Sequence, residues 1–271
     1  MQSVKKIKTL EKILQDMGSV LIAYSGGVDS SFLLKVASDC LKDKVLAVTA
    51  VSETYTKEEL EFARRFCRRF NIRHKVIRTQ ELGNRRFVSN TRQRCYFCKR
   101  ELFSKLKEIA QRNKIKYIID GTNSDDKNDF RPGEKAKYEF GVSSPLDEAG
   151  ISKKDIRYLS MKLKLPGWDR PQMACLASRM QYGTVITKAR LRRVEAAENI
   201  LRDKLTPKDN IRVRDYVDSA RIEVDKRNIP FLVKSDGFIS KLKRLGFKRV
   251  SVDLEGYRTG SMNQVRTQLT E

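Results

Sequence analysis

The sequence is poor in residues that several large classes of protein need. It contains one histidine, His74, and five cysteines, an odd number. A single histidine excludes a catalytic Ser-His or Cys-His pair that operates beside a histidine-bound metal. The N-terminus has the pattern of an amphipathic helix and not of a secretory signal, and the odd cysteine count argues against a disulfide framework. We therefore expect a cytoplasmic protein.

Long apolar runs are also lacking, since no stretch of about 18 apolar residues occurs, and we expect no contact with a membrane. Hydrophobic residues make up 39% of the 271 residues, enough for a buried core. The net charge is +23, from 57 Lys and Arg against 34 Asp and Glu. Such a surplus attracts nucleotides or nucleic acids. The basic residues are scattered and form no single tract, which makes a nucleic acid the less favoured partner.

Short apolar runs alternate with helical patterns in the first half of the chain. Strands are predicted over 19–25, 44–52, 73–79 and 116–123, and helices over 30–41, 57–70 and 98–113. This alternation implies a parallel sheet with helices on both faces. Later elements are a helix over 152–164, a helix over 187–204, a hairpin of 211–217 with 220–225, a helix over 235–245 and a strand over 247–254. We expect a larger α/β domain over 1–175 and a smaller α+β domain over 176–271.

A glycine turn with the sequence SGGVDSS lies between the first predicted strand and the first predicted helix after it. Adjacent glycines let the backbone approach a ligand closely, and the helix N-terminus offers free N–H groups to phosphate. Hydroxyl groups suit phosphate oxygens, and Asp29 can help to hold Mg²⁺. The lysine-containing Walker A pattern does not occur. The expected ATP-binding residues of this turn are Ser25, Gly26, Gly27, Asp29, Ser30 and Ser31.

A second turn, GTNSDD, follows residues 116–120 of the last predicted strand of this half. In an open α/β sheet, ligands bind beyond the carboxyl ends of the strands, and both turns lie there. We therefore add Gly121 and Asp125 to the expected ATP site, with Asp125 or Asp126 as a second contact for Mg²⁺. A solvated acidic turn is equally compatible with either carboxylate alone.

Three cysteines stand in distinctive surroundings. Cys95 and Cys98 form a C-x-x-C at the start of a predicted helix, and Cys175 lies in the segment MACLASR. A helix N-terminus lowers thiol pKa values, and three thiolates suit a [4Fe–4S] cluster with one iron that has no protein ligand. A redox pair or half of a zinc site would give the same C-x-x-C. Cys40 and Cys67 fall on apolar helix faces, which indicates core positions.

The glycine turn resembles the PP-loop of the ATP pyrophosphatase superfamily. Further segments together resemble the LarE family over almost the whole chain: RCYFCK, GTNSDD, DFRPGEKA, SPLDEAGISKKDIR, WDRPQMACLASRMQYG and DLEGYRTGSMN. The resemblance implies that ATP is split between its α- and β-phosphates to adenylylate the carboxylates of pyridinium-3,5-biscarboxylate mononucleotide. Sulfur then displaces AMP, and two rounds give the dithiocarboxylate precursor of a nickel-pincer nucleotide.

The family resemblance also bears on the sulfur source. One type of LarE sacrifices the sulfur of the cysteine in the CLASR segment, whereas a type with an additional C-x-x-C resembles cluster-dependent enzymes. The presence of Cys95 and Cys98 favours the second type, with Cys95, Cys98 and Cys175 as ligands of a [4Fe–4S] cluster and Cys175 in a catalytic position. Sulfide or another sulfur donor is the implied partner, and we expect a homo-oligomer.

Arginines on a predicted strand are the candidates for binding a phosphate of the substrate. In the segment IRVR, strand alternation directs Arg212 and Arg214 to one face. Guanidinium groups suit phosphate, and the resemblance supports this role, although two solvated arginines would give the same pattern. Ser178 and Arg179 follow Cys175 closely and join this set. Glu195 and Glu198, one helical turn apart, are further catalytic candidates.

Three other functions fit part of the sequence. A tRNA-thiolating enzyme of the same superfamily would use the same ATP chemistry and a similar cluster, and the positive charge would suit tRNA. An ammonia-using ligase such as NAD synthetase would need the PP-loop without a cluster. A non-catalytic module that binds an adenylate is the fourth interpretation.

Overall fold

The computed structural model describes residues 2–128, 132–234 and 237–263. Residues 129–131 of the segment DFRPGEKA lie outside this description. The described residues of 1–87 and 92–170 form one compact unit, and those of 88–91 and 171–263 form a second. Among the described residues, no helix combines the length and the apolar character needed to cross a membrane.

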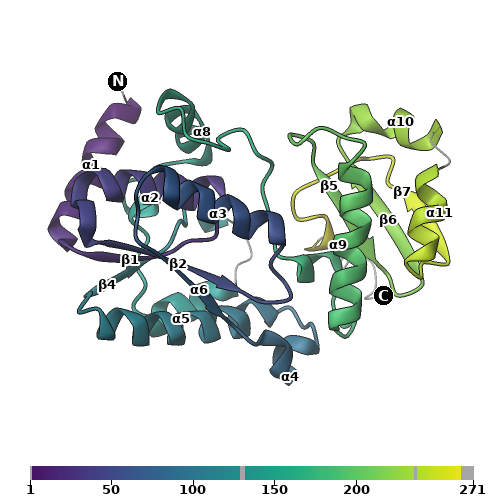
Figure 1. Ribbon diagram of the computed structural model, residues 1–271, viewed down its shortest axis with the longest axis horizontal. Helices are drawn as coiled ribbons and strands as arrows, with labels where there is room; N and C mark the ends of the chain where they lie inside the picture. The colour runs from purple at the N-terminus through teal and green to yellow at the C-terminus, as the bar shows by residue number, and fades with distance from the viewer. Residues whose placement is uncertain (1, 129–131, 235–236, 264–271) are drawn as a thin grey trace. The chain divides into compact units, whose positions relative to one another are not determined.

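A four-stranded parallel sheet is the centre of the first unit (Figure 1). Its strands are β1 (Val20–Ala23), β2 (Val45–Val51), β3 (His74–Arg78) and β4 (Tyr117–Ile119), in the order β3-β2-β1-β4. All three pairings are parallel. The α/β class and the four strands predicted from the sequence are therefore confirmed. Parallel strands that are buried on both faces read as continuous apolar runs, and β1 is such a run.

Helices cover both faces of this sheet (Figure 1). One face carries α1 (Gln2–Met17), α2 (Val28–Leu41), α3 (Lys57–Arg69) and α8 (Lys153–Lys162) together with the short α7 (Pro145–Glu148). The other face carries α5 (Arg94–Arg112) and α6 (Gly133–Phe140). Side chains of β1 alternate between the two layers, since Val20 and Ile22 belong to the first cluster and Leu21 to the second.

Capping residues determine where two of these helices begin. Thr56 accepts a hydrogen bond from the backbone N–H of Glu59, and the Glu59 carboxylate accepts one from the backbone of Thr56 at the start of α3. Ser152 and Asp155 form the same reciprocal capping box at the start of α8. The short α4 (Arg85–Val88), together with α6 and α7, was not among the elements predicted from the sequence.

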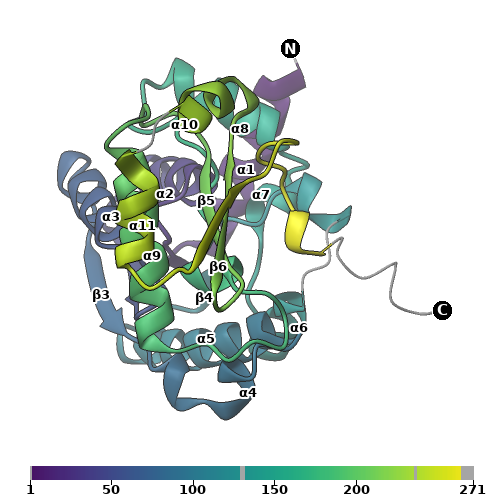
Figure 2. The ribbon, with the colours of Figure 1, turned by 90° about the vertical axis from the view of Figure 1, so that its right-hand side faces the viewer.

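The second unit contains a three-stranded sheet in the order β5-β6-β7. Its strands are β5 (Ile211–Asp215), β6 (Ser219–Val224) and β7 (Arg249–Val252), with β5 and β6 antiparallel and β6 and β7 parallel. The helices are α9 (Lys188–Arg202), α10 (Ile229–Lys234) and α11 (Gly237–Arg244). Helices α9 and α11 contact each other over this sheet (Figure 2). The hairpin predicted over 211–225 and the smaller α+β fold are confirmed.

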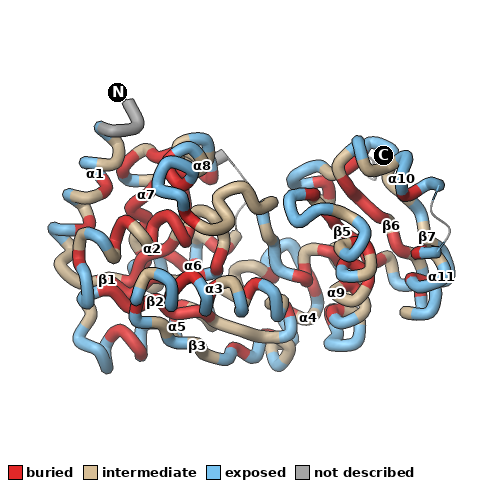
Figure 3. The backbone as a smooth tube through the Cα atoms, turned by 45° about the horizontal axis from the view of Figure 1, so that its top comes forward, coloured by how far each residue is buried: buried red, intermediate tan, exposed pale blue. Residues whose placement is uncertain are grey.

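Buried residues concentrate in the strands β1 and β2 of the first unit and β5 and β6 of the second (Figure 3). All five residues of β5 are buried, including its two arginines and Asp215. Charged side chains inside a core require partners, because an unpaired buried charge is strongly unfavourable. The buried charges of β5 therefore direct attention to the groups that surround them.

Candidate active site

The PP-loop connects β1 to α2 through Ser25, Gly26 and Gly27. Gly26 has φ +74°, a backbone conformation that glycine adopts without steric penalty. A β-carbon at Gly26 would also lie 3.4 Å from the carbonyl oxygen of Glu59. Gly27 is the N-cap of α2, and among the described residues no side chain caps this helix start. The first N–H groups of α2 are thus arranged as in anion sites at helix N-termini.

Hydrogen bonds within the loop fix its serines. Ser30 donates its hydroxyl hydrogen to the carbonyl of Gly27 at 3.1 Å, and the hydroxyls of Ser25 and Ser30 lie 3.1 Å apart. The hydroxyl of Tyr55 donates to the carbonyl of Ser25 at 2.7 Å. Ser31 is buried and pairs with the hydroxyl of Tyr24 at 3.2 Å. Ser25 and Ser30 therefore line the loop, whereas the Ser31 side chain points back into the core.

Gly121 brings the turn after β4 into contact with the PP-loop helix. A β-carbon at Gly121 would lie 2.9 Å from the backbone nitrogen of Ser30 and 3.0 Å from its Cα. Real β-carbons do not approach a backbone atom this closely, so the approach of these two segments requires glycine. The two turns that the sequence assigns to the ATP site are thus in direct contact at the carboxyl edge of the sheet.

Carboxylates of both turns interact beside this contact. Asp29 accepts a hydrogen bond from the side-chain amide of Asn123 at 3.0 Å. Burial raises the pKa of Asp29, and the charge of Asp126 raises it further, against the opposing effect of Lys153. Asp126 is buried and forms an ion pair with Lys153 Nζ at 2.9 Å. A buried carboxylate whose ionisation is disfavoured by burial and by a neighbouring carboxylate is a fitting environment for a divalent cation.

Asp125 has a different environment from Asp126. Its carboxylate is exposed and accepts a hydrogen bond from the backbone N–H of Lys153 at 2.8 Å, at the first residue of α8. Of the two carboxylates between which the sequence could not decide, Asp126 is the one whose charge acts on Asp29.

A buried lysine network that sequence reasoning missed lies behind the turn after β4. Asp120 accepts hydrogen bonds from Thr122 and, at 2.6 Å, from Ser144 Oγ. Lys137 is buried and donates to Ser144 at 2.7 Å. Burial alone would raise the pKa of Asp120, but the charges of Lys99 and Lys137, with the hydrogen bonds from Ser144 and Thr122, hold it below its usual value. The network fixes the residue that precedes Gly121.

Lys99 connects this network to the cysteine pair, because it directly follows Cys98. Its Nζ lies 3.8 Å from the Asp120 carboxylate, and a β-carbon at Gly133 would lie 2.6 Å from its Cδ. Gly133 therefore makes room for the lysine stem. The sequence signal that could have identified Lys99 is its position beside the C-x-x-C.

Cys95 and Cys98 lie in the first two turns of α5 and are half-buried. The Cys98 thiol donates to Glu81 Oε1 at 3.7 Å, and the same oxygen accepts a hydrogen bond from Thr79 at 2.8 Å. Cys175 is exposed and belongs to the second unit. Within the part of the chain that the structure describes, no three His, Cys, Asp or Glu side chains are grouped as metal ligands. Cys40 and Cys67 pack against the core, as predicted.

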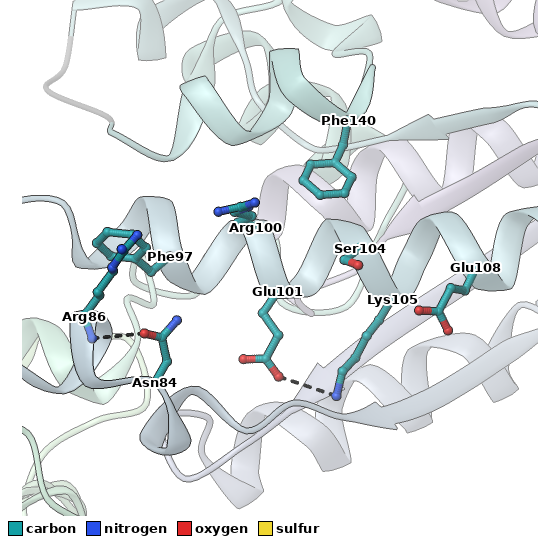
Figure 4. A pocket seen from close by; sticks show the side chains of 9 residues that line it. All are labelled: Asn84, Arg86, Phe97, Arg100, Glu101, Ser104, Lys105, Glu108 and Phe140. Atoms are coloured by element: carbon teal, nitrogen blue, oxygen red, sulfur yellow. Dashed lines mark hydrogen bonds and ion pairs between the residues drawn. The ribbon is translucent and has the colours of Figure 1, made fainter.

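A pocket of about 570 Å³ runs along α5 on the side of Phe97, the residue just before Cys98 (Figure 4). Among the lining side chains, Arg100 lies between the rings of Phe97 and Phe140 (Figure 4). Glu101, which also lines the pocket, forms an ion pair with Lys105 at 3.4 Å. None of these residues was a predicted site residue.

In the second unit, Arg179 holds the segment that carries Cys175. Arg179 is 1% exposed and donates to the carbonyl of Cys175 at 3.1 Å, to Ser178 Oγ at 3.1 Å and to the carbonyl of Ala174. Cys175 directly precedes a 3-10 turn over Leu176–Arg179. A buried guanidinium that binds consecutive carbonyls determines the path of this short segment.

The other side of Arg179 faces Glu198 of α9. Two parallel hydrogen bonds of 2.8 and 2.9 Å join them, and Glu198 also accepts the backbone N–H of Val213 at 3.1 Å. Burial alone would raise the pKa of Glu198, but the charge and hydrogen bonds of Arg179 hold it below its ordinary value. Glu195, one turn earlier on α9, is half-buried. Glu198 is therefore the partner of Arg179.

Arg214 is also paired inside the second unit. It donates to Glu223 at 2.6 Å, to Ser261 Oγ at 2.9 Å and to the carbonyl of Ser178 at 3.1 Å. Glu223 is fully buried and also pairs with Arg221 at 3.3 Å. One carboxylate thus serves two guanidinium groups here.

Arg212 has a different set of neighbours. It is buried, donates to the carbonyls of Ile211 and Gln172, and lies 5.2 Å from the ring centre of Tyr257. Burial, and next the charge of Arg179, lower its pKa to about 10, against the attraction of Glu198. Arg179 and Arg212 therefore share the single charge of Glu198. This surplus of buried positive charge is suited to an anionic ligand.

Known proteins are similar to this chain both in its PP-loop region and over nearly its whole length. The asparagine synthase family matches residues 9–97, the part that contains the PP-loop. The chain is 41% identical to an uncharacterised protein of Synechocystis over 97% of its own length and 98% of that protein. It is 38% identical to pyridinium-3,5-bisthiocarboxylic acid mononucleotide synthase of Lactiplantibacillus plantarum, over 97% of its own length and 95% of the synthase.

The synthase is similar to this chain from end to end, so the similarity includes the PP-loop unit and the unit with the buried arginines. An uncharacterised protein of Methanocaldococcus jannaschii is also similar to nearly the whole chain, with 31% identity over 94% of this chain and 98% of that protein. The chain therefore belongs to the LarE family, the family of pyridinium-3,5-bisthiocarboxylic acid mononucleotide synthases within the PP-loop superfamily.

Proposed function

We propose that this protein is an ATP-dependent sulfur transferase that converts pyridinium-3,5-biscarboxylate mononucleotide to its dithiocarboxylate. The observation that carries the proposal is the coincidence of two features in one chain. The PP-loop meets the turn of Gly121 at the carboxyl edge of the sheet, and the whole chain is similar to a synthase of the bisthiocarboxylate. Family membership makes the chain an enzyme.

The first unit would bind ATP and activate the carboxylate. The uncapped N-terminus of α2 offers N–H donors to the phosphates, and the hydroxyls of Ser25 and Ser30, whose hydrogens bond within the loop here, would turn to the phosphate oxygens when ATP binds. Mg²⁺ fits the carboxylates of Asp29 and Asp126, because a cation would offset both the burial and the repulsion from Asp126 that raise the pKa of Asp29. A substrate carboxylate oxygen attacks the α-phosphorus, the bond to the β-phosphate breaks, and pyrophosphate leaves. Lys99, near the same edge, supplies positive charge close to this reaction.

The second unit would hold the substrate through its phosphate. Arg179 forms an ion pair with Glu198, and Arg214 forms one with Glu223. Within the described residues, the hydrogen bonds of Arg212 go to backbone carbonyls and not to a carboxylate. We therefore assign the phosphate chiefly to Arg212, with Ser178 as a neutral donor. Arg179 and Glu198 then act as positioning residues that hold the Cys175 segment. We also propose Glu195 as a catalytic residue.

Sulfur transfer would replace AMP at the activated carboxylate. A sulfide sulfur forms the C–S bond, the C–O bond to AMP breaks, and AMP leaves with the electron pair. Cys95, Cys98 and Cys175 are the proposed ligands of a [4Fe–4S] cluster, which when bound offers one iron without a protein ligand to sulfide. The half-buried pair at the start of α5 and the exposed Cys175 suit this donor set chemically. We also propose that the protein forms a homo-oligomer and that its two domains meet at residues 175 and 176.

The test is the stoichiometry of the reaction. Purified protein is incubated anaerobically with ATP, Mg²⁺, the biscarboxylate mononucleotide and sulfide, and pyrophosphate, AMP and the sulfur-containing product are quantified. We expect one pyrophosphate and one AMP per sulfur introduced, and none of the three without the mononucleotide. Pyrophosphate released with ammonia in place of sulfide, together with an amide product, would instead identify an ammonia-using ligase.

The cluster has its own test. Iron and acid-labile sulfide are measured after anaerobic reconstitution of the wild type, Cys95→Ala, Cys175→Ala and the control Cys40→Ala. We expect about four iron and four sulfide per chain in the wild type and in Cys40→Ala, and a loss in the other two variants. If neither the wild type nor any variant binds iron, and the intact mass of the wild type falls by one hydrogen sulfide after a single turnover, Cys175 is instead a sacrificial donor that becomes dehydroalanine.

A further inference from the structure

A second pocket in the first unit lies beside the edge strand β3. Its volume is about 470 Å³, and its lining includes Arg64 and Arg68 of α3, Asn71 of the following turn and His74 of β3. None of these residues was predicted for the ATP or substrate site. The lining therefore belongs to no function assigned so far.

The pocket presents positive charge. Arg64 and Arg68 are one helical turn apart on α3, so their side chains extend over the same face. Arg64 forms an ion pair with Glu61 at 3.2 Å, in which both side chains are about half exposed. Exposed pairs of this kind contribute little, about 0–1 kcal/mol, and yield readily to a better ligand. Among the described contacts, Arg68 has no carboxylate partner.

His74 adds a group whose hydrogen-bonding state is fixed by its neighbours. The hydroxyl of Thr49 donates its hydrogen to the carbonyl of Tyr24 at 2.8 Å. The same oxygen lies 2.8 Å from His74 Nε2, so it must accept from that nitrogen. We therefore assign the neutral ring a hydrogen on Nε2 and a lone pair on Nδ1. Protonation of Nδ1 adds a donor and a positive charge to a ring that lines the pocket.

We propose that this pocket binds a tetrahedral oxyanion, a phosphate ion or a phosphate monoester, through the guanidinium groups of Arg64 and Arg68 and the protonated ring of His74. The side-chain amide of Asn71, which also lines the pocket, is a neutral donor for the same ligand. Guanidinium forks match the geometry of phosphate oxygens. The same imidazole ring is linked through Thr49 to the carbonyl of Tyr24, the residue directly before the PP-loop.

The charged and titratable groups around His74 define the expected response. Arg64 and Cys67 of α3 line the pocket, and the ring of Tyr24 lies 6.0 Å away, edge-on. Burial raises the pKa of Cys67 to about 12 and that of Tyr24 well above its usual value, so both are neutral at physiological pH. Burial and then the charge of Arg64 lower the pKa of His74. A bound anion opposes the effect of Arg64 and therefore raises the pKa of His74.

The chain contains a single histidine, so the imidazole resonances in its NMR spectrum belong to His74. The imidazole resonance of untagged protein is followed by NMR against pH at increasing sulfate, a dianion that does not titrate in this range. We expect a saturable rise in the His74 pKa, on the order of one unit. Arg68→Gln should abolish this rise. Arg65→Gln removes the same charge from an exposed position on the same helix and should preserve it.

Competition then identifies the source of the anion. Displacement of sulfate by inorganic phosphate alone indicates the free ion, and displacement also by AMP indicates phosphate monoesters. The proposal is overturned if the His74 pKa does not respond to sulfate, if chloride at equal ionic strength gives the same response, if neither phosphate compound competes, or if Arg68→Gln responds as the wild type does. None of these readouts depends on the sulfur-transfer reaction, so the two proposals succeed or fail separately.

Discussion

The buried pair of Arg179 and Glu198 allows a prediction with a defined magnitude. The two side chains are 1% and 3% exposed and share two hydrogen bonds. Glu198→Gln keeps the size of the side chain but removes its charge, which leaves the guanidinium groups of Arg179 and Arg212 without their common carboxylate. Removing one partner of a buried ion pair costs about 3–5 kcal/mol. We expect a loss of that size in the free energy of unfolding.

Glu198 interacts with two guanidinium groups, whereas Arg179 has one carboxylate partner among the described ion pairs, so the two substitutions should differ in cost. Arg179→Gln should cost less than Glu198→Gln, because Arg212 remains to interact with Glu198. Since the pKa of Glu198 is depressed in the folded protein, its contribution is complete well above the ordinary value of 4.5 and is lost as the pH falls through the lower folded value. The difference between wild type and Glu198→Gln should therefore be constant near neutral pH and shrink only in acid.

Urea unfolding followed by circular dichroism measures these differences, with Glu195→Gln as the matched control on the same helix. The control should lie within about 0.5 kcal/mol of the wild type, as is usual away from buried networks. A Glu198→Gln variant as stable as Glu195→Gln would show that the pair does not organise this unit. A Glu198→Gln variant less affected than Arg179→Gln would show that Arg212 does not share the charge of Glu198.

Three further predictions concern ligand binding and turnover. Gly121→Ala places a β-carbon 2.9 Å from Ser30, so ATP should bind about tenfold more weakly, whereas Gly83→Ala, which meets nothing within 4 Å, should bind ATP normally in calorimetry. Asp29→Asn should slow pyrophosphate release by on the order of a hundredfold in a coupled assay, and a wild-type rate would remove Asp29 from the reaction. Arg212→Gln should raise KM for the mononucleotide by on the order of tenfold with a smaller change in kcat, while exposed Arg192→Gln should leave both unchanged.

The fold could be predicted from the sequence because its signals are local. The apolar run that became β1 and the helical pattern that became α2 are visible in short windows, and α9 and the β5–β6 hairpin follow from the same periodicities. The short α6 and α10 were missed, since helices of six to eight residues offer few turns of periodicity. The PP-loop was found because its residues are consecutive.

The charge partners could not be predicted, because they join residues far apart in the sequence. Nothing near Arg179 shows that it pairs with Glu198, and Glu223 was not recognised as the partner of Arg214. A strand pattern predicts that Arg212 and Arg214 share a face but not that the face is buried. The buried Lys137 gave no signal, since its partners come from two other loops.

The claim on which the account depends most is that a substrate carboxylate is adenylylated before sulfur enters. The most direct measurement uses pyridinium-3,5-biscarboxylate mononucleotide labelled with a heavy oxygen isotope in its carboxylates, with ATP, Mg²⁺ and sulfide. After turnover, the AMP is isolated and analysed by mass spectrometry. We predict that one labelled oxygen is transferred to the phosphate of each AMP formed together with a thiocarboxylate. Unlabelled AMP formed alongside the sulfur-containing product would contradict it.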